Sequence, residues 1–241
     1  MTTLLDVKNL ARSFGGLVAV NDVSFALAKG QITALIGPNG AGKTTCFNLV
    51  AGALKPTSGQ VFFQGQSIEG APPENVCRMG IARTFKIVSP MRDMSVLENA
   101  MVGAFSWPRN VSEARSTAYE SLESVGLVGK AYARTDQLTM SDRKMLEVAK
   151  ALSTRPKLLL LDEVMAGLRP TEAVSVVQVL RKLAESGLTI LLVEHVMRIV
   201  MEVASTVVVL HHGAKIAEGC PKDVVADPQV LESYLGAGFH A

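Results

Sequence analysis

One stretch decides the fold of this chain: Gly37-Pro38-Asn39-Gly40-Ala41-Gly42-Lys43-Thr44-Thr45. Its spacing fits the pattern G-x-x-x-x-G-K-[ST], which binds phosphate where it joins a strand to a helix. That context is present, because the apolar run at residues 32–36 predicts a buried strand and residues 46–51 predict a helix that ends at Gly52. The alternative, a glycine-rich turn that binds nothing, is disfavoured by both flanks.

The residue types in this loop suit a nucleotide. Glycines allow successive backbone N–H groups to turn toward a phosphate, and the helix that begins near Gly42 adds the positive end of its dipole. Lys43 is expected to reach the β- and γ-phosphates of ATP, and the Thr44 hydroxyl to bind Mg²⁺. We therefore predict that residues 37–45 bind the nucleotide.

The composition describes a globular chain that is more apolar than average. Its 241 residues suffice for one large domain or for a core with a subdomain. Hydrophobic residues make up 48% and charged residues 19%, which favours surfaces that another chain covers, with an adhesive monomer as the competing explanation. The net charge of +2 provides no basic field, so nucleic acid is not expected as a partner.

The cysteines and the apolar runs indicate the compartment. Cys46, Cys77 and Cys220 are far apart without C-x-x-C spacing, so neither a disulfide framework nor a zinc site is expected, and a reducing cytosol fits. The first eight residues lack the basic region and apolar core of a signal peptide. Apolar runs are strand-sized and far shorter than the ~18 residues of a membrane span, so we expect the chain not to cross a membrane.

Strand patterns flank the loop on both sides. Residues 4–7 and 18–27 predict strands with turns at 15–16 and 29–30, and residues 58–65 predict an edge hairpin. A small antiparallel sheet is therefore expected beside the nucleotide. Phe14 precedes the strand of the loop, where its ring either stacks on a base or packs in the core.

The pattern changes to helices between about residues 72 and 155, which indicates an inserted helical subdomain. Asn110 with Glu113 forms a possible capping box. Ala114, Ala118 and Leu122 recur at helical spacing and predict a buried stripe.

A second apolar strand ends in two carboxylates. Residues 158–161 are four leucines, and Asp162 and Glu163 follow them. Carboxylates at the end of a buried strand require a cationic partner, and a phosphate-binding loop with Mg²⁺ provides one. We predict that Asp162 holds the metal and that Glu163 polarises the water that attacks the γ-phosphate, the alternative being a strand that simply ends in polar residues.

The remaining pattern completes an α/β sheet. A helix is predicted at 171–186, a buried strand at 188–193, further strands at 206–210 and 215–217, and a last helix that begins at Asp227-Pro228. His195 follows the strand at 188–193, at the end where the nucleotide is expected, which makes it a candidate functional residue.

Together, residues 37–45, residues 158–163 and His195 resemble the Walker A motif, the Walker B motif and the switch histidine of ABC-transporter ATPases. The segments Arg83-Thr84-Phe85 and Leu161-Asp162-Glu163-Val164-Met165-Ala166-Gly167-Leu168 are similar to the branched-chain amino acid (LivG/LivF-type) importers. This resemblance implies a P-loop NTPase (RecA-like) α/β core with a mainly parallel sheet, a small antiparallel β subdomain and an inserted α-helical subdomain at about 72–155, within a single ABC ATPase domain of residues 1–241. By the same resemblance Phe14 stacks on the adenine.

The resemblance also implies the assembly. The chain would bind and hydrolyse ATP with Mg²⁺, and would pair head to tail with a second ABC ATPase, identical or merely similar, with two ATP molecules between them. Two transmembrane permease subunits and, indirectly, a solute-binding protein outside the membrane would complete an importer. The chain would then lie in the cytoplasm, peripheral on the inner face of the cell membrane.

Two positions depart from the family pattern. Lys86 stands where the family has Gln in the coupling loop, and an ammonium is unfavourable beside a metal. The signature Leu-Ser-Gly-Gly-Gln is replaced by Leu138-Thr139-Met140-Ser141-Asp142, followed by a helix predicted at 143–153. Thr139 and Ser141 remain as candidate donors to the ATP of the partner, Met140 is expected to turn away, and Asp142 to lie in the first helical turn, compensated by Arg143, Lys144 or the dipole.

Two other classes of function stay open on these residues. One is an ATP-binding regulatory or assembly subunit that hydrolyses ATP weakly, which Glu163 and His195 argue against. The other is an ABC ATPase that acts on DNA or ribosomes instead of transport, which the lack of a basic excess disfavours.

Overall fold

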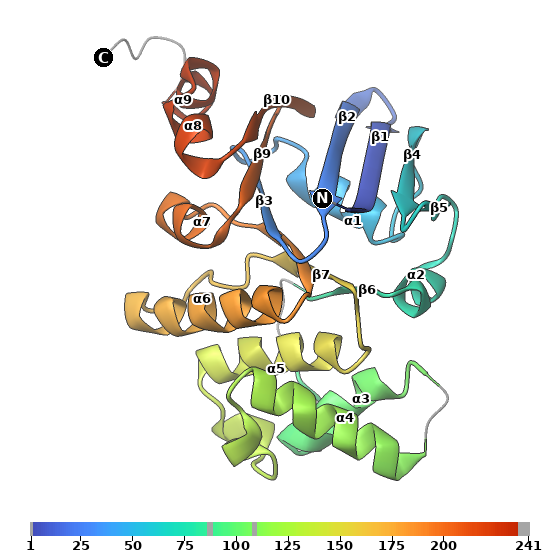
Figure 1. Ribbon diagram of the computed structural model, residues 1–241, viewed down its shortest axis with the longest axis vertical. Coiled ribbons are helices and arrows are strands. Elements are labelled where there is room, and N and C mark those ends of the chain that lie inside the picture. Colours follow the sequence, from blue (N-terminus) through green and yellow to red (C-terminus); the bar gives the residue numbers. More distant parts are fainter. Residues whose placement is uncertain (1, 86–88, 108–109, 236–241) are drawn as a thin grey trace.

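The computed structural model describes residues 2–85, 89–107 and 110–235, which form two sheets and a set of helices (Figure 1). The larger sheet, called the core sheet below, has the strand order β10-β9-β3-β8-β7-β6 within these residues. All its neighbouring strands run parallel except β10, which pairs antiparallel with β9. Its strands are β3 (Ile32–Ile36), β6 (Ile81–Arg83), β7 (Leu158–Asp162), β8 (Thr189–Val193), β9 (Thr206–His211) and β10 (Ala214–Gly219).

The core sheet is built from the apolar runs of the sequence. Every residue of β3, β7 and β8 is buried. Continuous apolar strands are stable only where both faces of the sheet are covered, since backbone crossovers place other elements on each face. The mainly parallel α/β core expected from the sequence is confirmed.

The smaller sheet, called the antiparallel sheet, has the order β2-β1-β4-β5. Its strands are β1 (Thr3–Phe14), β2 (Leu17–Ala28), β4 (Ser58–Phe63) and β5 (Gln66–Ser67). The expected hairpin at 58–65 is present, with β5 at the edge. Strand β1 is longer than the predicted 4–7, because its pairing with β2 shifts register between Val7 and Arg12 and so interrupts the alternation of the side chains.

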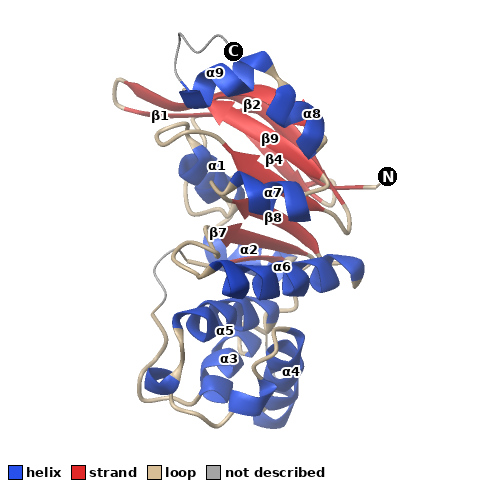
Figure 2. Cartoon of the chain, turned by 90° about the vertical axis from the view of Figure 1, so that its left-hand side faces the viewer, coloured by secondary structure: helices blue, strands red, loops and turns tan. Residues whose placement is uncertain are grey.

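Helices cover both faces of the core sheet (Figure 2). Helix α1 carries Phe47 into an interior shared with Leu35 of the core sheet and Leu5 of the antiparallel sheet. On the opposite face, the helices at one end of the molecule pack with α6 against Leu159 and Leu161. The helices are α1 (Lys43–Val50), α2 (Pro73–Met79), α3 (Val96–Ala104), α4 (Val111–Ser124), α5 (Met140–Leu152), α6 (Pro170–Glu185), α7 (Met197–Val203), α8 (Pro221–Ala226) and α9 (Pro228–Leu235), with short 3₁₀ turns η1 (Val128–Lys130) and η2 (Thr135–Gln137).

The segment expected to be helical, 72–155, contains more than helices. Asn110 caps α4 by accepting a hydrogen bond from the Glu113 N–H at 2.9 Å, and the predicted stripe at Ala114, Ala118 and Leu122 is fully buried. The same segment also supplies β6, which pairs in parallel with β7 in the core sheet. A strand of three residues is too short to show a period in the sequence, so the helical expectation missed it.

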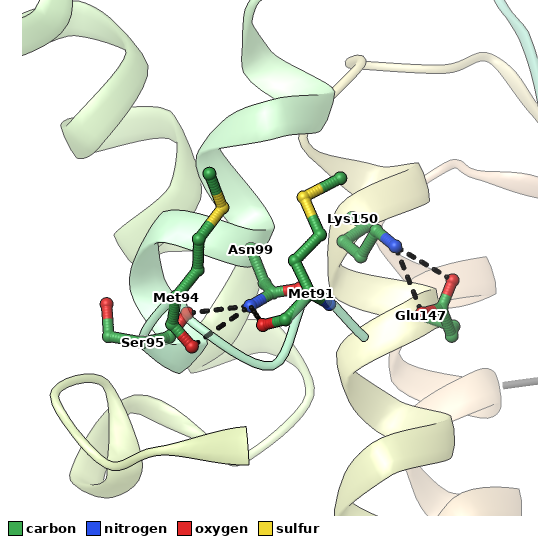
Figure 3. A network of polar contacts seen from close by, with 6 residues as sticks. All are labelled: Met91, Met94, Ser95, Asn99, Glu147 and Lys150. Atoms are coloured by element: carbon green, nitrogen blue, oxygen red, sulfur yellow. Dashed lines mark hydrogen bonds and ion pairs between the residues drawn. The ribbon is translucent and has the colours of Figure 1, made fainter. Parts of the chain in front are cut away.

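Helix α3 fixes the loop that precedes it. Asn99 is fully buried, and its amide nitrogen donates to the carbonyls of Met91 at 3.1 Å, Met94 at 3.3 Å and Ser95 at 3.0 Å (Figure 3). Its amide oxygen accepts from the Met91 N–H at 2.8 Å. Because one side chain satisfies four backbone groups, residues 91–95 are held against the first turn of α3.

The carboxyl-terminal part follows the prediction at its last helix. The Asp227 carboxylate accepts a hydrogen bond from the Gln229 N–H at 2.8 Å, and α9 begins at Pro228. Helices α7 and α8 were not expected, since each spans fewer than two turns. No helix in the described ranges combines the length and apolarity needed to cross a bilayer.

Candidate active site

The predicted functional residues follow three neighbouring strands of the core sheet. Strands β3, β8 and β7 are adjacent and parallel, and Val193 pairs with Leu35 on one side and with Asp162 on the other. The three carboxyl ends therefore lie side by side, and the loop at 37–42, the residue Glu163 and the residue His195 follow them. Ligands of open α/β sheets bind at such an edge.

The loop after β3 has two positions that only glycine can occupy. A Cβ atom at Gly37, where φ is +146°, would lie 2.1 Å from the carbonyl oxygen of Leu210. At Gly42, where φ is +96°, it would lie 2.3 Å from the carbonyl oxygen of Ala19. Both obstacles are backbone atoms, so the path of the loop depends on these glycines.

The start of α1 suits a phosphate chain. The helix has no side-chain cap at Gly42 and no acidic residue in its first turn. Lys43 is buried, and its Nζ donates to the carbonyl oxygens of Gly37 at 2.7 Å and Pro38 at 2.8 Å, so the ammonium lies within the loop. Uncapped N–H groups beside an ammonium favour a polyanion, and the residues therefore fit ATP.

Two carboxylates end β7 as predicted. Asp162 is buried, and its N–H lies 3.4 Å from the Thr84 hydroxyl oxygen. The Glu163 backbone has φ +48°, in the left-handed region. Its N–H donates to the Val193 carbonyl at 2.9 Å, and its carbonyl accepts from the Lys144 ammonium at 3.2 Å.

A magnesium ion fits this edge only with phosphates as additional ligands. The described residues contain no group of three or more His, Cys, Asp or Glu side chains that could hold a metal. Mg²⁺ is commonly held by one or two protein oxygens together with substrate phosphates. Thr44, which is exposed in the first turn of α1, and Asp162 supply oxygens of that kind.

His195 lies at the same edge and is accessible. Its side chain is 55% exposed, whereas that of the preceding Glu194 is 0% exposed. Glu194 accepts a hydrogen bond from the Met165 N–H at 3.0 Å through Oε1, and its Oε2 lies 4.0 Å from His195 Nδ1. Burial raises the pKa of Glu194, while the N–H groups of Met165 and His195 and the charge of His195 oppose that shift.

The altered signature begins α5. The Thr139 hydroxyl accepts from the Asp142 N–H at 3.1 Å, and the Asp142 carboxylate accepts from the Thr139 N–H at 3.0 Å. This capping box starts the helix at Met140, three residues before the predicted start. Asp142 lies in the first turn as expected, but the expected partners were wrong, because its carboxylate pairs with Lys130 at 2.6 Å.

The other signature residues surround that turn. The Met140 side chain is 54% exposed and Ser141 is half-buried. Lys144, expected near Asp142, is buried and directed to Glu163 instead. The contact of Thr139 and Ser141 with the nucleotide of a second subunit stays a prediction.

Phe14 lies outside the core. It ends β1 at the tip of the β1–β2 hairpin and is 44% exposed, and the Arg12 guanidinium lies 4.7 Å from its ring centre. This exposure excludes the core-packed alternative and leaves the ring accessible to a base. Lys86, the coupling-loop candidate, lies outside the described residues.

Sequence reasoning assigned no contact to Arg83, which the structure places between two rings. Its guanidinium carbon lies 5.1 Å from the Phe47 ring centre and 4.9 Å from that of Phe85, and Nη1 donates to the Asn48 amide oxygen at 2.7 Å. Burial lowers the pKa of Arg83, and the charge of Asp162 opposes that shift. Arg83 thus joins α1 to β6, and only its place beside Thr84-Phe85 hinted at a role.

Tyr234 of α9 is a second residue that the sequence did not indicate. Burial raises the pKa of its phenol, and a hydrogen bond with the Gly37 backbone opposes that shift. Val230, one turn earlier in α9, is buried in a cluster with Ile36, the residue before Gly37. The last described helix therefore contacts the start of the phosphate-binding loop, across a sequence separation that no local pattern reveals.

Comparisons with known proteins agree with this geometry. A family model described as ABC transporter matches residues 20–166, and one described as branched-chain amino acid ATP-binding cassette transporter matches residues 214–240. The high-affinity branched-chain amino acid transport ATP-binding protein LivG of Escherichia coli (strain K12) is 39% identical over 97% of this chain and 98% of its own. BraF of Pseudomonas aeruginosa, of the same description, is 37% identical over 97% of this chain and 98% of its own.

Solved structures agree as well. A crystal structure of the ADP conformation of an ATP-binding cassette of an ABC transporter is similar with a TM-score of 0.90 and 31% identity, over 98% of this chain and 100% of the other. A nucleotide-free ATP-binding cassette gives a TM-score of 0.89 at 31% identity, over 98% of this chain and 100% of the other. The chain belongs to the ABC transporter family, as an ATP-binding cassette and ATPase.

Proposed function

We propose that this protein is the ATP-hydrolysing subunit of an ABC importer for branched-chain amino acids or related small solutes. The observation that carries the proposal is the meeting of residues 37–45, Asp162-Glu163 and His195 at one edge of the core sheet. The names of LivG and BraF and the family model matched by residues 214–240 support the substrate class. An intact set of candidate groups favours hydrolysis over the regulatory alternative, since Glu163 and His195 are both in place.

In this proposal the chain binds and orients ATP before any bond is broken. Phe14 stacks on the adenine, the N–H groups of residues 39–45 surround the phosphates, and Lys43 exchanges its two carbonyl acceptors for phosphate oxygens. Thr44 and Asp162 hold Mg²⁺, which when bound bridges β- and γ-phosphate oxygens and neutralises the charge that develops on them. Glu163 accepts a proton from the attacking water, and His195 donates a hydrogen bond to the γ-phosphate.

The proposed assembly has a second ABC ATPase and two transmembrane permeases, with a solute-binding protein as an indirect partner. Thr139 and Ser141 of each ATPase face the ATP of the other. The chain lies on the cytoplasmic face of the membrane through its permeases, and residues 72–155 act as a helical subdomain that transmits the contact. Family membership supports this arrangement, and no contact of the single chain depends on it.

A groove near the candidate site suits a permease segment. Its volume is about 350 Å³, and it is lined by residues of α2, β6, α3 and α5, including the exposed side chains of Phe85 and Val102. Thr84, the neighbour of Phe85, contacts the N–H of Asp162. A permease side chain in this groove would therefore press on the segment that touches the candidate metal ligand.

The groove can be tested by charge insertion. We expect Val102→Asp to reduce copurification with the permeases, because a carboxylate in an apolar contact loses its hydration. Val128→Asp is the matched control, as Val128 is a similarly exposed valine outside the groove. Equal retention of both variants by the permeases would contradict the docking site.

The whole proposal is tested by reconstitution. The protein and its copurified membrane subunits are placed in proteoliposomes, and ATP turnover is measured together with uptake of labelled leucine. We expect ATP-dependent uptake and a turnover that the membrane subunits increase, both absent with Lys43→Ala. Turnover that is indifferent to the membrane subunits but changes with DNA or ribosomes would favour the non-transport alternative, and no turnover in any combination would favour the regulatory one.

A further inference from the structure

Glu194 is a buried carboxylate that the proposed reaction does not use. It follows β8 directly, and its side chain is 0% exposed. One oxygen, Oε1, accepts the Met165 N–H at 3.0 Å, and the other, Oε2, has no hydrogen-bond partner among the described residues. A carboxylate at such a place is expensive to desolvate, and an ionisable side chain buried beside a reaction site is a candidate for a role in it.

Its hydrogen bond holds the turn that carries Glu163. Met165 is two residues beyond Glu163, and the Ala166 N–H closes the turn by donating to the Glu163 carbonyl at 3.1 Å. The left-handed φ of +48° at Glu163 is a conformation that persists only where surrounding contacts impose it. Glu194 ties the turn to β8, and the Lys144 ammonium ties the Glu163 carbonyl to α5 at 3.2 Å.

The other oxygen faces His195. The distance from Glu194 Oε2 to His195 Nδ1 is 4.0 Å, and the imidazole is more than half exposed. A small rotation of the exposed ring brings Nδ1 within hydrogen-bond reach of a carboxylate that cannot itself move. A carboxylate that accepts from Nδ1 fixes the tautomer and orientation of the ring, and it leaves Nε2 directed away toward the substrate.

We propose that Glu194 is a positioning residue that sets Glu163 and His195 in register with each other and with the γ-phosphate. One oxygen fixes the backbone turn of the candidate base, and the other orients the candidate phosphate donor. The inference rests on the proposed ATP hydrolysis at this edge. It adds that the two groups are coupled through a single buried side chain that contacts neither ATP nor water.

The test compares Glu194→Ala and Glu194→Gln with the wild type by steady-state ATP turnover, ATP binding and thermal unfolding. We expect Glu194→Ala to lower kcat by about 10²-fold, the loss that a displacement of about 1 Å can cause, while ATP affinity is retained. Glu194→Gln keeps an oxygen for the Met165 N–H but loses the charge that faces His195, so its kcat should be intermediate. Glu98→Gln is the matched control, because Glu98 also accepts a backbone N–H, that of Ser95 at 2.7 Å, but in the cap of α3.

A double variant separates positioning from a loss of stability. In a His195→Ala background, Glu194→Gln should cause little further loss of kcat, because the oxygen that faces His195 has nothing left to orient. Wild-type kcat in Glu194→Ala, or a loss of kcat and ATP affinity in equal proportion, would overturn the proposal. If Glu194→Ala does not fold, Glu194→Gln decides alone, and a wild-type kcat there overturns it. Failure of the proposed function looks different, since Glu163→Gln would then retain turnover.

Discussion

Lys43 has two alternative sets of acceptors. In the chain alone its ammonium is bound by the carbonyls of Gly37 and Pro38. Phosphate oxygens are better acceptors for a cation, so ATP can draw the same ammonium outward without creating a new buried charge. A lysine that is already inside the loop loses little conformational entropy when it binds the nucleotide.

We expect Lys43→Ala to abolish tight ATP binding. A hydrogen bond to a charged group contributes about 1.5–3 kcal/mol, and Lys43 should make more than one such bond. Titration calorimetry of the variant against the wild type measures the loss. Lys29→Ala removes an exposed lysine from the turn before β3, at the opposite end of that strand, and should bind ATP normally; unchanged affinity in Lys43→Ala would refute the assignment of the loop.

Glu163 is expected to serve chemistry and not affinity. Glu163→Gln preserves the shape of the side chain and every backbone contact of the turn, but the amide cannot accept the proton of water. We expect ATP binding to persist and turnover to fall by ~10²–10⁴-fold, the usual effect of losing a general base. Single-turnover measurements with labelled ATP would show this, and hydrolysis within a few-fold of the wild type would assign the base to another residue and favour the regulatory alternative.

At the scale of elements, the start of α5 depends on a charge. Burial, the largest single influence, raises the pKa of Asp142, but the hydrogen bonds from Lys130 and Thr139 and the charge of Lys130 outweigh it, and the pKa lies below its usual value. A carboxyl group whose pKa is lowered by folding stabilises the folded state above its unfolded pKa. This contribution is lost as the pH falls through the folded pKa.

Asp142→Asn should therefore destabilise the protein at neutral pH and not in acid. We expect the free energy of unfolding to fall by about 0.5–1 kcal/mol at pH 7, because the amide keeps a cap but loses the attraction to Lys130 and to the helix dipole. Urea unfolding at several pH values measures the difference. Asp136→Asn, which affects an ion pair exposed on both sides, is the control, and a difference for Asp142→Asn that does not depend on pH would count against the argument.

The sequence predicted those elements whose pattern is local. Strands β3, β7 and β8 are uninterrupted apolar runs because both their faces are covered, and the loop at 37–45 has a fixed spacing imposed by its phosphate. Strand β6 and helices α7 and α8 escaped because three to seven residues do not establish a period. Element type was thus readable wherever the element exceeded about two turns or was buried throughout.

The candidate site divides along the same line. Topology alone brings the ends of β3, β7 and β8 together, so Asp162, Glu163 and His195 could be placed from the sequence. The contacts of Glu194 with Met165 and of Lys144 with Glu163 join segments 29 and 19 residues apart. They depend on how α5 and the turn after β7 pack, and no spacing in the sequence encodes that packing.

At the scale of the whole molecule, the altered signature should limit association. In the proposed dimer the start of α5 in one copy approaches the ATP held by the other. Here the Thr139 hydroxyl is already occupied by the Asp142 N–H, and the Met140 side chain projects into solvent. A phosphate approaches a helix start closely where glycine is present, whereas a methionine side chain must first be displaced.

We therefore expect the isolated protein to form only a weak ATP-dependent homodimer and to need its permeases, or a second ATPase with a more usual signature, to close. Sedimentation of Glu163→Gln with ATP tests this, since the variant retains ATP, and a tight homodimer at low micromolar concentration would show that the signature is no handicap. Adding Met140→Gly should strengthen the dimer, and Met140→Ala should do so less, because only glycine removes all the bulk at that position. Tyr132→Ala removes another exposed apolar side chain away from the start of α5 and should leave dimerisation unchanged; if it has the same effect as Met140→Gly, the handicap lies in surface hydrophobicity and not in access to the phosphate.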